Sequence, residues 1–284
     1  MISSIQFKNT NIDVLRLDAM NLPVGGNKFY KLKYNIAEAL EMNFPSLITF
    51  GGAFSNHVCA VALAGKLNNL KTIGVIRGED DTNNPTLNFC REQGMFLHFM
   101  SREDYKNKYD ENFIDACINK FGDIYLLPEG GTNALALKGT SEILTGIDIQ
   151  YDHIICAVGT GGTLAGIIST PDLRSKVTGI SVLKGDTNLS EKVSSLLDVE
   201  NENWEINYNY HLGGYAKYNT ELMEFILQFE KTYSILLDPV YTGKVFYAIF
   251  DMIDKKQIAP DQKILAIHTG GLQGWAGWKY RYNK

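Results

Sequence analysis

Short apolar runs alternate along this chain with segments in which apolar residues recur every three or four positions. The apolar runs, bounded by polar or glycine-rich turns, predict buried β-strands. These strands are Ser46–Phe50, Thr72–Arg77, Phe96–Met100, Ile124–Leu127, His153–Val158, Gly179–Val182, Ile235–Leu237 and Ile264–His268. The segments with helical spacing predict amphipathic helices over Lys31–Glu41, Asn56–Leu67 and Thr220–Glu230.

This alternation predicts an α/β fold in which helices cover both faces of open, twisted, mostly parallel sheets. Ligands bind such sheets beyond the carboxyl ends of the strands, where glycine-rich turns are common. Gly51-Gly52, Gly159–Gly162 and Gly270-Gly271 each follow a predicted strand, and Gly25-Gly26 leads into a predicted helix. The polar, poorly periodic stretch Lys184–Asn207 predicts a surface excursion.

Composition and charge narrow the class of protein. The 284 residues are 45% hydrophobic and 21% charged, which is typical of a globular protein with one large domain or two. A net charge of -5 without a basic stripe argues against a nucleic-acid partner. The cysteines lack metal-ligand spacing, so we expect reduced thiols and no metal site. No signal peptide and no membrane-spanning apolar run is visible, so we expect a cytoplasmic protein without a membrane partner.

The start of the first predicted helix holds the candidate for covalent chemistry. Gly25, Gly26 and Asn27 precede Lys28, and Lys31 follows one turn later. A lysine forms a Schiff base only when its amine is neutral, and burial or a neighbouring cation lowers its pKa from about 10.4. The alternative is a solvated helix face of lysines, continued by Lys33, after an ordinary turn.

The segment from Ile154 to Gly166 runs from strand through a glycine loop into a helix. Backbone amides at such a helix start bind phosphate, each hydrogen bond to a charged group contributing about 1.5–3 kcal/mol. No Gly-Lys-Ser/Thr closes the loop, which excludes a P-loop, and Leu164 occupies the last glycine position of the dinucleotide fingerprint. We therefore predict a site for one phosphate; the alternative is a structural turn.

Two further turns carry polar groups. In Gly51–His57, Ser55 or Asn56 is a natural helix N-cap, or the amides here bind a substrate carboxylate while the Ser55 hydroxyl faces a reacting atom. A serine hydrolase is disfavoured, because neighbouring helix positions diverge and no G-x-S-x-G elbow is present. Tyr241 follows another predicted strand and either packs on the core, stacks near a cofactor or relays a proton.

Together these motifs resemble the fold-type II pyridoxal-phosphate enzymes, and most closely the 1-aminocyclopropane-1-carboxylate deaminase / D-cysteine desulfhydrase family. The motifs that carry the resemblance are Gly25–Leu32, Gly51–His57, Pro128–Asn133, Gly159–Thr163, Asp238–Lys244 and His268–Gly271. The resemblance covers nearly the whole chain. It implies a large cofactor-binding domain (1–40 and 142–284), a small domain (41–141), pyridoxal 5'-phosphate in the cleft between them, and a homodimer.

The resemblance also implies roles for individual residues. Lys28 would form the Schiff base with the cofactor and shuttle the α-proton, with Lys31 as a second cation nearby. Asn56 would bond the phenolic oxygen of the cofactor, and Thr269 would face its pyridine nitrogen. The phosphate would be held by Gly159, Thr160, Gly161, Gly162 and Thr163.

On the substrate side, the resemblance implies that Ser55 orients the carboxylate or assists proton transfer. Tyr241 and Tyr215 match the two active-site tyrosines of the family. The substrate would also meet Phe54, Asn56, His57 and Thr242.

Three positions bear on the substrate. Thr242 and Thr269 stand where the deaminase branch has glutamate and leucine, which resembles the desulfhydrase branch. Phe54 replaces the usual glutamine and removes a polar contact. We expect a lyase that removes a β-leaving group, such as thiolate, and ammonia from a small amino acid. The alternatives are a 1-aminocyclopropane-1-carboxylate deaminase, another deaminase, racemase or dehydratase, or a catalytically silent phosphate-binding module.

Overall fold

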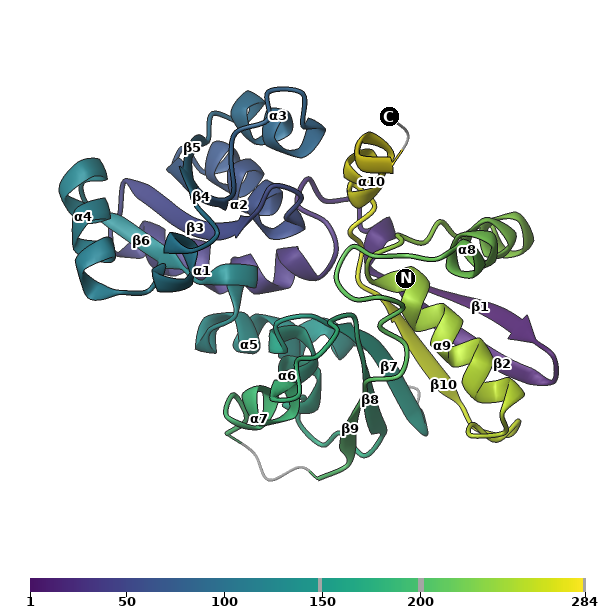
Figure 1. Ribbon diagram of the computed structural model, residues 1–284. Helices are drawn as coiled ribbons and strands as arrows, with labels where there is room; N and C mark the ends of the chain where they lie inside the picture. Colours follow the sequence, from purple (N-terminus) through teal and green to yellow (C-terminus); the bar gives the residue numbers. More distant parts are fainter. Residues whose placement is uncertain (148–149, 199–201, 283–284) are drawn as a thin grey trace.

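The computed structural model describes residues 1–147, 150–198 and 202–282 and shows an α/β protein with two sheets (Figure 1). The larger sheet has the strand order β1-β2-β10-β7-β8-β9 and is parallel except for the β1–β2 hairpin. Its strands are β1 (Ile2–Phe7), β2 (Thr10–Arg16), β7 (His153–Val158), β8 (Lys176–Ser181), β9 (Trp204–Asn207) and β10 (Ile264–His268). The predicted fold class is confirmed.

The smaller sheet is parallel throughout, in the order β5-β4-β3-β6. Its strands are β3 (Ser46–Gly52), β4 (Lys71–Arg77), β5 (Phe96–Met100) and β6 (Ile124–Leu127). The helices of the chain are α1 (Asn27–Glu41), α2 (Asn56–Leu67), α3 (Pro85–Glu92), α4 (Glu111–Phe121), α5 (Ala134–Thr140), α6 (Gly162–Ile168), α7 (Leu189–Ser194), α8 (Thr220–Tyr233), α9 (Thr242–Asp254) and α10 (Gly274–Tyr282). Within the described ranges, each helix is too short or too polar to cross a membrane.

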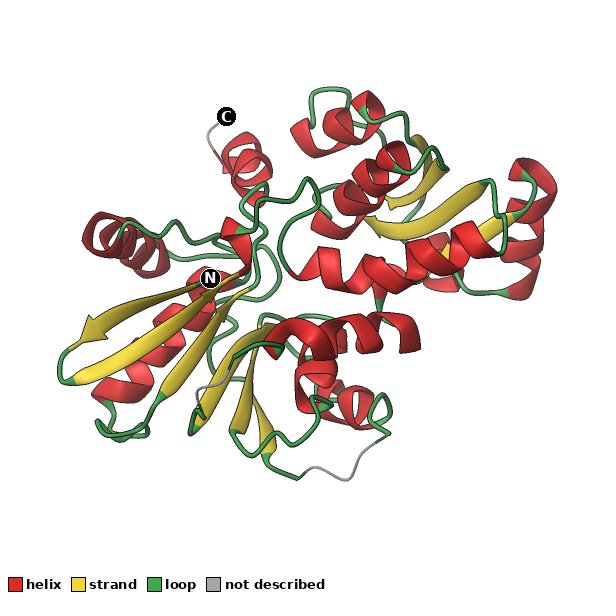
Figure 2. Ribbon diagram, turned by 180° about the vertical axis from the view of Figure 1, so that it is seen from behind, coloured by secondary structure: helices red, strands yellow, loops and turns green. Residues whose placement is uncertain are grey.

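Each sheet carries its own hydrophobic core, and the two sheets lie on opposite sides of the molecule (Figures 1 and 2). Helix α1 packs Leu32, Ile36 and Ala39 into the core of the smaller sheet. The resemblance places residues 1–40 in the large domain, whereas α1, which begins at Asn27, packs its apolar side chains on the smaller sheet. The apolar stripe of α1 explains the difference, because it needs the nearest apolar surface to cover it.

One predicted strand is wrong. Ile235–Leu237 belongs to neither sheet, although Ile235 and Leu237 are buried. The carbonyl of Leu236 accepts a hydrogen bond from His268 Nε2 at 2.8 Å, and that of Leu237 accepts one from Trp275 Nε1 at 2.9 Å. Side chains therefore take the hydrogen bonds that a neighbouring strand would have supplied.

Three strands were not predicted. The N-terminal hairpin β1–β2 forms one edge of the larger sheet, and β9 forms the other. Strand β9, together with α7, lies in the stretch Lys184–Asn207 that we expected to be a surface excursion, and residues 199–201 of that stretch lie outside the described residues. Strands β1 and β9 lie at the two edges of the sheet and bury few side chains, so their hydrophobic pattern is weak. Strand β2 lies inside the sheet and buries Ile12, Val14 and Leu15, so its pattern was present in the sequence and was missed.

Candidate active site

A glycine turn places Lys28 in the first turn of α1. Gly26 caps this helix with φ +68, and the amide of Asn27 donates to the carbonyl of Thr269 at 3.0 Å. A Cβ on Gly26 would lie 2.4 Å from that same carbonyl oxygen. Only glycine allows both this backbone conformation and the close approach. The start of α1 is thereby fixed against the carboxyl end of β10, as the two glycine motifs suggested.

Lys28 as a residue is half-buried, and its amine donates to Asn27 Oδ1 at 3.3 Å. Burial lowers the pKa of Lys28 to about 8, and attraction to Asp238 partly opposes this effect. Near neutral pH about a tenth of the molecules would therefore carry the amine in its neutral, nucleophilic form.

Lys31 is buried and donates to the carbonyl of Gly130 at 2.8 Å and to Thr132 Oγ1 at 3.2 Å. Its pKa lies well below the ordinary value because of burial and then because of the charge on Lys28. The two lysines are thus electrostatic neighbours. The solvated-face interpretation holds for Lys33, which is ion-paired with Glu142 at 2.6 Å on the outside of the helix.

The glycine loop between β7 and α6 is tied to both lysines. Thr163 Oγ1 accepts a hydrogen bond from Asn27 Nδ2 at 2.9 Å, next to Lys28. Thr160 Oγ1 lies 2.8 Å from Thr132 Oγ1, which also bonds Lys31. Gly161 adopts the left-handed conformation at φ +87 as the cap of α6. The predicted phosphate loop and the predicted lysine therefore lie side by side.

The Ser-Asn-His turn opens α2. Ser55 is its N-cap and accepts from the amide of Val58 at 3.3 Å, while Asn56 Nδ2 reaches the carbonyl of Gly271 at 3.4 Å. His57 points the other way. It is buried, and its Nε2 lies 2.9 Å from Oγ1 of Thr49, on β3 of the smaller sheet.

This placement removes the His57 side chain from the list of expected substrate contacts. Burial, followed by the charges of Lys28 and Lys31, lowers the pKa of His57 well below its ordinary value, so the imidazole stays neutral. Its ring bonds Thr49 rather than Ser55, and the structure shows no Ser-His dyad among the described side chains. At His57, therefore, the backbone lies in the first turn of α2 while the side chain faces Thr49.

A buried carboxylate shapes the turn that carries Tyr241. Asp238 is fully buried, and its oxygens accept from the amides of Val240, Tyr241 and Thr242 at 2.8–2.9 Å. The Thr242 hydroxyl donates to Asp238 Oδ1 at 2.8 Å and accepts from the Asp238 amide at 2.8 Å. Thr242, also fully buried, is therefore occupied by the turn itself rather than brought to a substrate.

The two predicted tyrosines meet. The rings of Tyr215 and Tyr241 lie edge to face, with centroids 6.0 Å apart and planes at 72°. Tyr241 Cε1 would lie 3.5 Å from a Cβ on Gly159, so its ring stands over the first residue of the glycine loop. Burial raises the pKa of Tyr241 well above the ordinary value, which keeps its hydroxyl protonated at neutral pH.

A cavity of about 450 Å³ opens beside Lys28. It is lined by the turn at Gly25 and Gly26, by Gly270 and Gly271, and by side chains of α2, α3 and α10. Phe54 packs against Gly277 of α10, where an added Cβ would lie 2.6 Å from its ring. A contact between Phe54 and a substrate stays a prediction.

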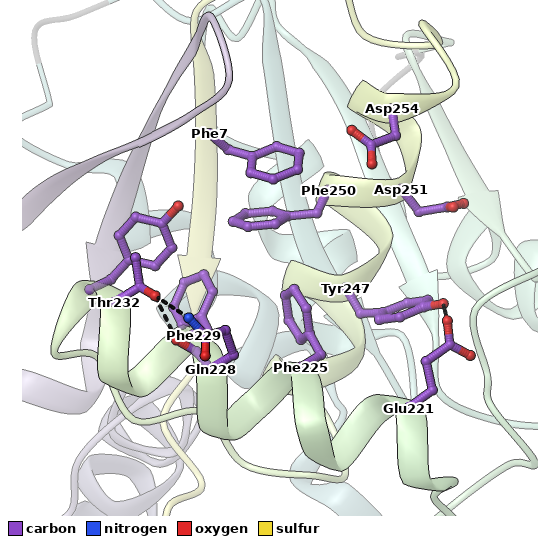
Figure 3. A pocket seen from close by; sticks show the side chains of 11 residues that line it. Phe7, Glu221, Phe225, Gln228, Phe229, Thr232, Tyr247, Phe250, Asp251 and Asp254 are labelled. Carbon is purple, nitrogen blue, oxygen red and sulfur yellow. Dashed lines mark hydrogen bonds between the residues drawn. The ribbon is translucent and has the colours of Figure 1, made fainter.

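Another cavity, of about 480 Å³, lies between α8, α9 and the end of β1 (Figure 3). Aromatic rings such as Phe225 and Phe250 line it, and none of the predicted site residues does. It is therefore separate from the lysine site.

Several residues of the site were not predicted individually. Asn27, Thr132 and Asp238 connect the motifs to one another. All three belong to motifs that were singled out for other residues. Asn27 precedes Lys28, Thr132 lies within the Pro128–Asn133 segment, and Asp238 lies three positions before Tyr241, and these positions were the sequence signal that could have identified them. Their partners come from distant parts of the chain, which sequence spacing alone does not show.

The chain matches the family described as "Pyridoxal-phosphate dependent enzyme" over residues 7–270. It belongs to this family. A Pyrococcus horikoshii protein named "Putative 1-aminocyclopropane-1-carboxylate deaminase" is 32% identical, over 93% of this chain and 85% of its own length. An Arabidopsis thaliana protein named "Bifunctional D-cysteine desulfhydrase/1-aminocyclopropane-1-carboxylate deaminase, mitochondrial" is also 32% identical, over 93% of this chain and 73% of its own length.

Solved structures agree with this assignment. A crystal structure described as an "ACC deaminase homologue" superposes with a TM-score of 0.83 at 30% identity, covering 93% of this chain and 86% of that one. A hydrogen sulfide-producing enzyme from Fusobacterium nucleatum shares the fold, with a TM-score of 0.70 at 17% identity, over 96% of this chain and 95% of that one. The expected family, fold type and cofactor are confirmed, and the protein is an enzyme of the lyase or deaminase type.

The residues present fit pyridoxal phosphate. The site offers an amine whose pKa is lowered to about 8, as covalent attachment of an aldehyde requires. Next to it stands a glycine loop at the start of a helix, which suits a phosphate. Tyr241 lies beside the first residue of the glycine loop, the carbonyl of Thr269 accepts from the amide next to Lys28, and Asn56 reaches the carbonyl of Gly271.

Proposed function

We propose that this enzyme removes a β-leaving group and ammonia from a small amino acid, and that D-cysteine is the substrate to test first. In that reaction D-cysteine and water give pyruvate, hydrogen sulfide and ammonia. The observation that carries the proposal is the half-buried Lys28, whose turn is bonded to Thr269 on one side and, through Asn27, to the glycine loop on the other. The name of the Arabidopsis relative supports the choice of D-cysteine.

Lys28 is the residue to move the α-proton. Its amine can take a proton at neutral pH because burial has lowered its pKa to about 8. Bound pyridoxal phosphate supplies an electron sink for the pair of electrons left on the α-carbon. The glycine loop, with the hydroxyls of Thr160 and Thr163, would hold the phosphate group, and the amine of Lys31 is joined to this loop through Thr132.

The substrate would be held from the side of α2 and the tyrosines. The first amides of α2, capped by Ser55, suit a carboxylate. Asn56 would bond the cofactor's phenolic oxygen, and the Thr269 hydroxyl would face its ring nitrogen. Tyr241 and Tyr215 would donate a proton or a hydrogen bond to the departing group, since a raised pKa keeps the Tyr241 hydroxyl protonated.

Deamination of 1-aminocyclopropane-1-carboxylate is the second candidate, because several relatives carry that name. Thr269, in place of the leucine of the deaminase branch, favours the first candidate. Thr242 contributes less to this choice than expected, since its hydroxyl is occupied by Asp238. A silent phosphate-binding module is disfavoured, because such a protein has no use for an amine that is costly to bury.

The test is to supply the purified enzyme with pyridoxal phosphate and compare D-cysteine, L-cysteine and 1-aminocyclopropane-1-carboxylate. Pyruvate and sulfide formation from D-cysteine, abolished in Lys28→Ala, is the expected result. Formation of 2-oxobutyrate from the cyclopropane, without activity on D-cysteine, would overturn the proposal in favour of the second candidate. A Thr269→Leu variant should shift the preference toward the cyclopropane.

We also propose a cellular location, together with the domain division and the oligomeric state that the family resemblance implies. Residues 1–40 and 142–284 would form a large cofactor-binding domain and residues 41–141 a small one, with the cofactor between them. The presence of two separate sheets supports this division, although α1 packs on the core of the smaller sheet. A homodimer in the cytoplasm, acting on a small amino acid without a nucleic-acid partner, completes the proposal. Size-exclusion chromatography with light scattering would test the dimer.

A further inference from the structure

Lys244 is a buried cation that the proposed reaction does not use. It lies on α9 with no exposed surface, and its Nζ donates to the carbonyls of His211 and Gly214, each at 2.7 Å. Among the described residues no carboxylate forms an ion pair with it. Burying an ammonium is unfavourable unless hydrogen bonds replace those it loses from water. The carbonyls of His211 and Gly214 provide these hydrogen bonds, so the loop that carries them is what Lys244 holds in place.

Both carbonyls belong to a loop whose conformation is unfavourable in isolation. Leu212 and Ala216 adopt positive φ values of 45 and 52, and the glycines between them have φ values of 94 and 105. Residues with a Cβ adopt this left-handed conformation only at a cost in free energy. Surrounding contacts must therefore impose the shape of the loop.

The contacts that impose it come from two helices. Lys244 of α9 holds the first half of the loop through the carbonyls of His211 and Gly214. Tyr282 of α10 holds the second half by donating its hydroxyl to the carbonyl of Ala216 at 3.0 Å. Tyr215 stands between these two attachment points.

The orientation of Tyr215 follows from this arrangement. Tyr215 as a whole residue is 41% exposed, and its ring meets that of Tyr241 edge to face, with the two centroids 6.0 Å apart. Tyr241 is placed by the carboxylate of Asp238, six positions before Lys244. The short segment Asp238–Lys244 thus acts on both tyrosines. The carboxylate of Asp238 holds the turn that carries Tyr241, and the ammonium of Lys244 holds the loop that carries Tyr215.

We propose that Lys244 is a positioning residue that sets Tyr215 against Tyr241 by holding the carbonyls of His211 and Gly214. This inference rests on the proposed function for the catalytic use of Tyr215. The effect of Lys244 on turnover passes through Tyr215, whereas a lysine that only stabilises the fold would affect every step and every variant alike.

The test is a double-mutant cycle in the enzyme loaded with pyridoxal phosphate. Lys244→Met keeps the length of the side chain but removes its donors. We expect it to lower kcat about tenfold or more with less than a threefold change in KM, and to cost less than twofold when Tyr215 is already phenylalanine. Lys255→Met, at the exposed end of the same helix, is the matched control and should leave kcat unchanged. An equal loss in both Tyr215 backgrounds would overturn the proposal.

A second measurement does not depend on turnover. Hydrogen exchange of a peptide covering residues 211–218 should speed up at least tenfold in Lys244→Met and remain unchanged in Lys255→Met. If Lys244→Met does not fold, Lys244→Gln keeps one donor and should give an intermediate exchange rate and an intermediate kcat. Wild-type exchange rates in both variants would overturn the proposal. Failure of the wild-type enzyme to turn over any of the amino acids would instead reject the proposed function and leave the exchange result to decide the role of Lys244.

Discussion

Replacing Lys28 with methionine should stabilise the cofactor-free protein while abolishing activity. Burial lowers the pKa of Lys28 from 10.5 to about 8, so at neutral pH the folded protein holds an ammonium that would be better solvated in the unfolded chain. One pKa unit corresponds to about 1.36 kcal/mol, which gives a penalty of about 3 kcal/mol. Methionine has a similar length and no charge. We expect the free energy of unfolding at pH 7 to rise by about 1–3 kcal/mol.

The increase in the free energy of unfolding caused by Lys28→Met should become smaller as the pH rises. Between pH 8 and 10.5 the unfolded wild-type chain binds a proton that the folded chain has released, so this term stabilises the wild type as the pH rises through that window. The advantage of Lys28→Met should therefore shrink above pH 8 and vanish near pH 10.5. Urea denaturation of both cofactor-free proteins at several pH values measures this directly.

Lys66→Met provides the control, because Lys66 is an exposed helix lysine and its replacement should change stability by less than about 0.5 kcal/mol at every pH. A Lys28→Met protein that is less stable than the wild type at pH 7 would refute the reasoning. So would a stability difference that stays constant from pH 7 to pH 10.

Two other substitutions test the turn that precedes Lys28 and the turn that carries Tyr241. Gly26→Ala should weaken pyridoxal phosphate binding about tenfold or more, because the new Cβ would lie 2.4 Å from the carbonyl oxygen of Thr269 at a positive φ. A spectroscopic titration with the cofactor measures this, and Gly25→Ala, whose nearest neighbour would be 3.9 Å away, should bind like the wild type. Asp238→Asn should lower the free energy of unfolding in urea by about 2–4 kcal/mol, because an amide cannot accept all the hydrogen bonds of this buried carboxylate. A variant as stable as the wild type would show that the carboxylate does not organise the turn.

Features set by neighbouring residues were predictable from the sequence. Helix α2 occupies the predicted range Asn56–Leu67, because Ser55 is both a strong N-cap and the end of a glycine turn. The lysine turn and the glycine loop were recognisable for the same reason. In each, glycine permits a backbone path that other residues resist.

Features set by tertiary contacts were not predictable. Ile235–Leu237 has the composition of a strand, but His268 and Trp275 take its carbonyls. His57 and Thr242 stand within the correct motifs, yet His57 faces Thr49 and the hydroxyl of Thr242 is bound by Asp238. Membership of a motif fixes where the backbone goes, whereas the direction of a side chain depends on what the remainder of the chain packs against it.

The central claim is that Lys28 is the residue that binds the cofactor. The lowered pKa does not decide this alone, because Lys31 and Lys244 are also buried and also have lowered pKa values. Both of those amines already donate to backbone carbonyls, whereas within the described part of the chain Lys28 donates only to the side chain of Asn27. Borohydride reduction of the enzyme loaded with pyridoxal phosphate, followed by peptide mass spectrometry, locates the modified lysine. The account predicts modification at Lys28 alone; modification at Lys31 or Lys244, or none at all, would contradict it.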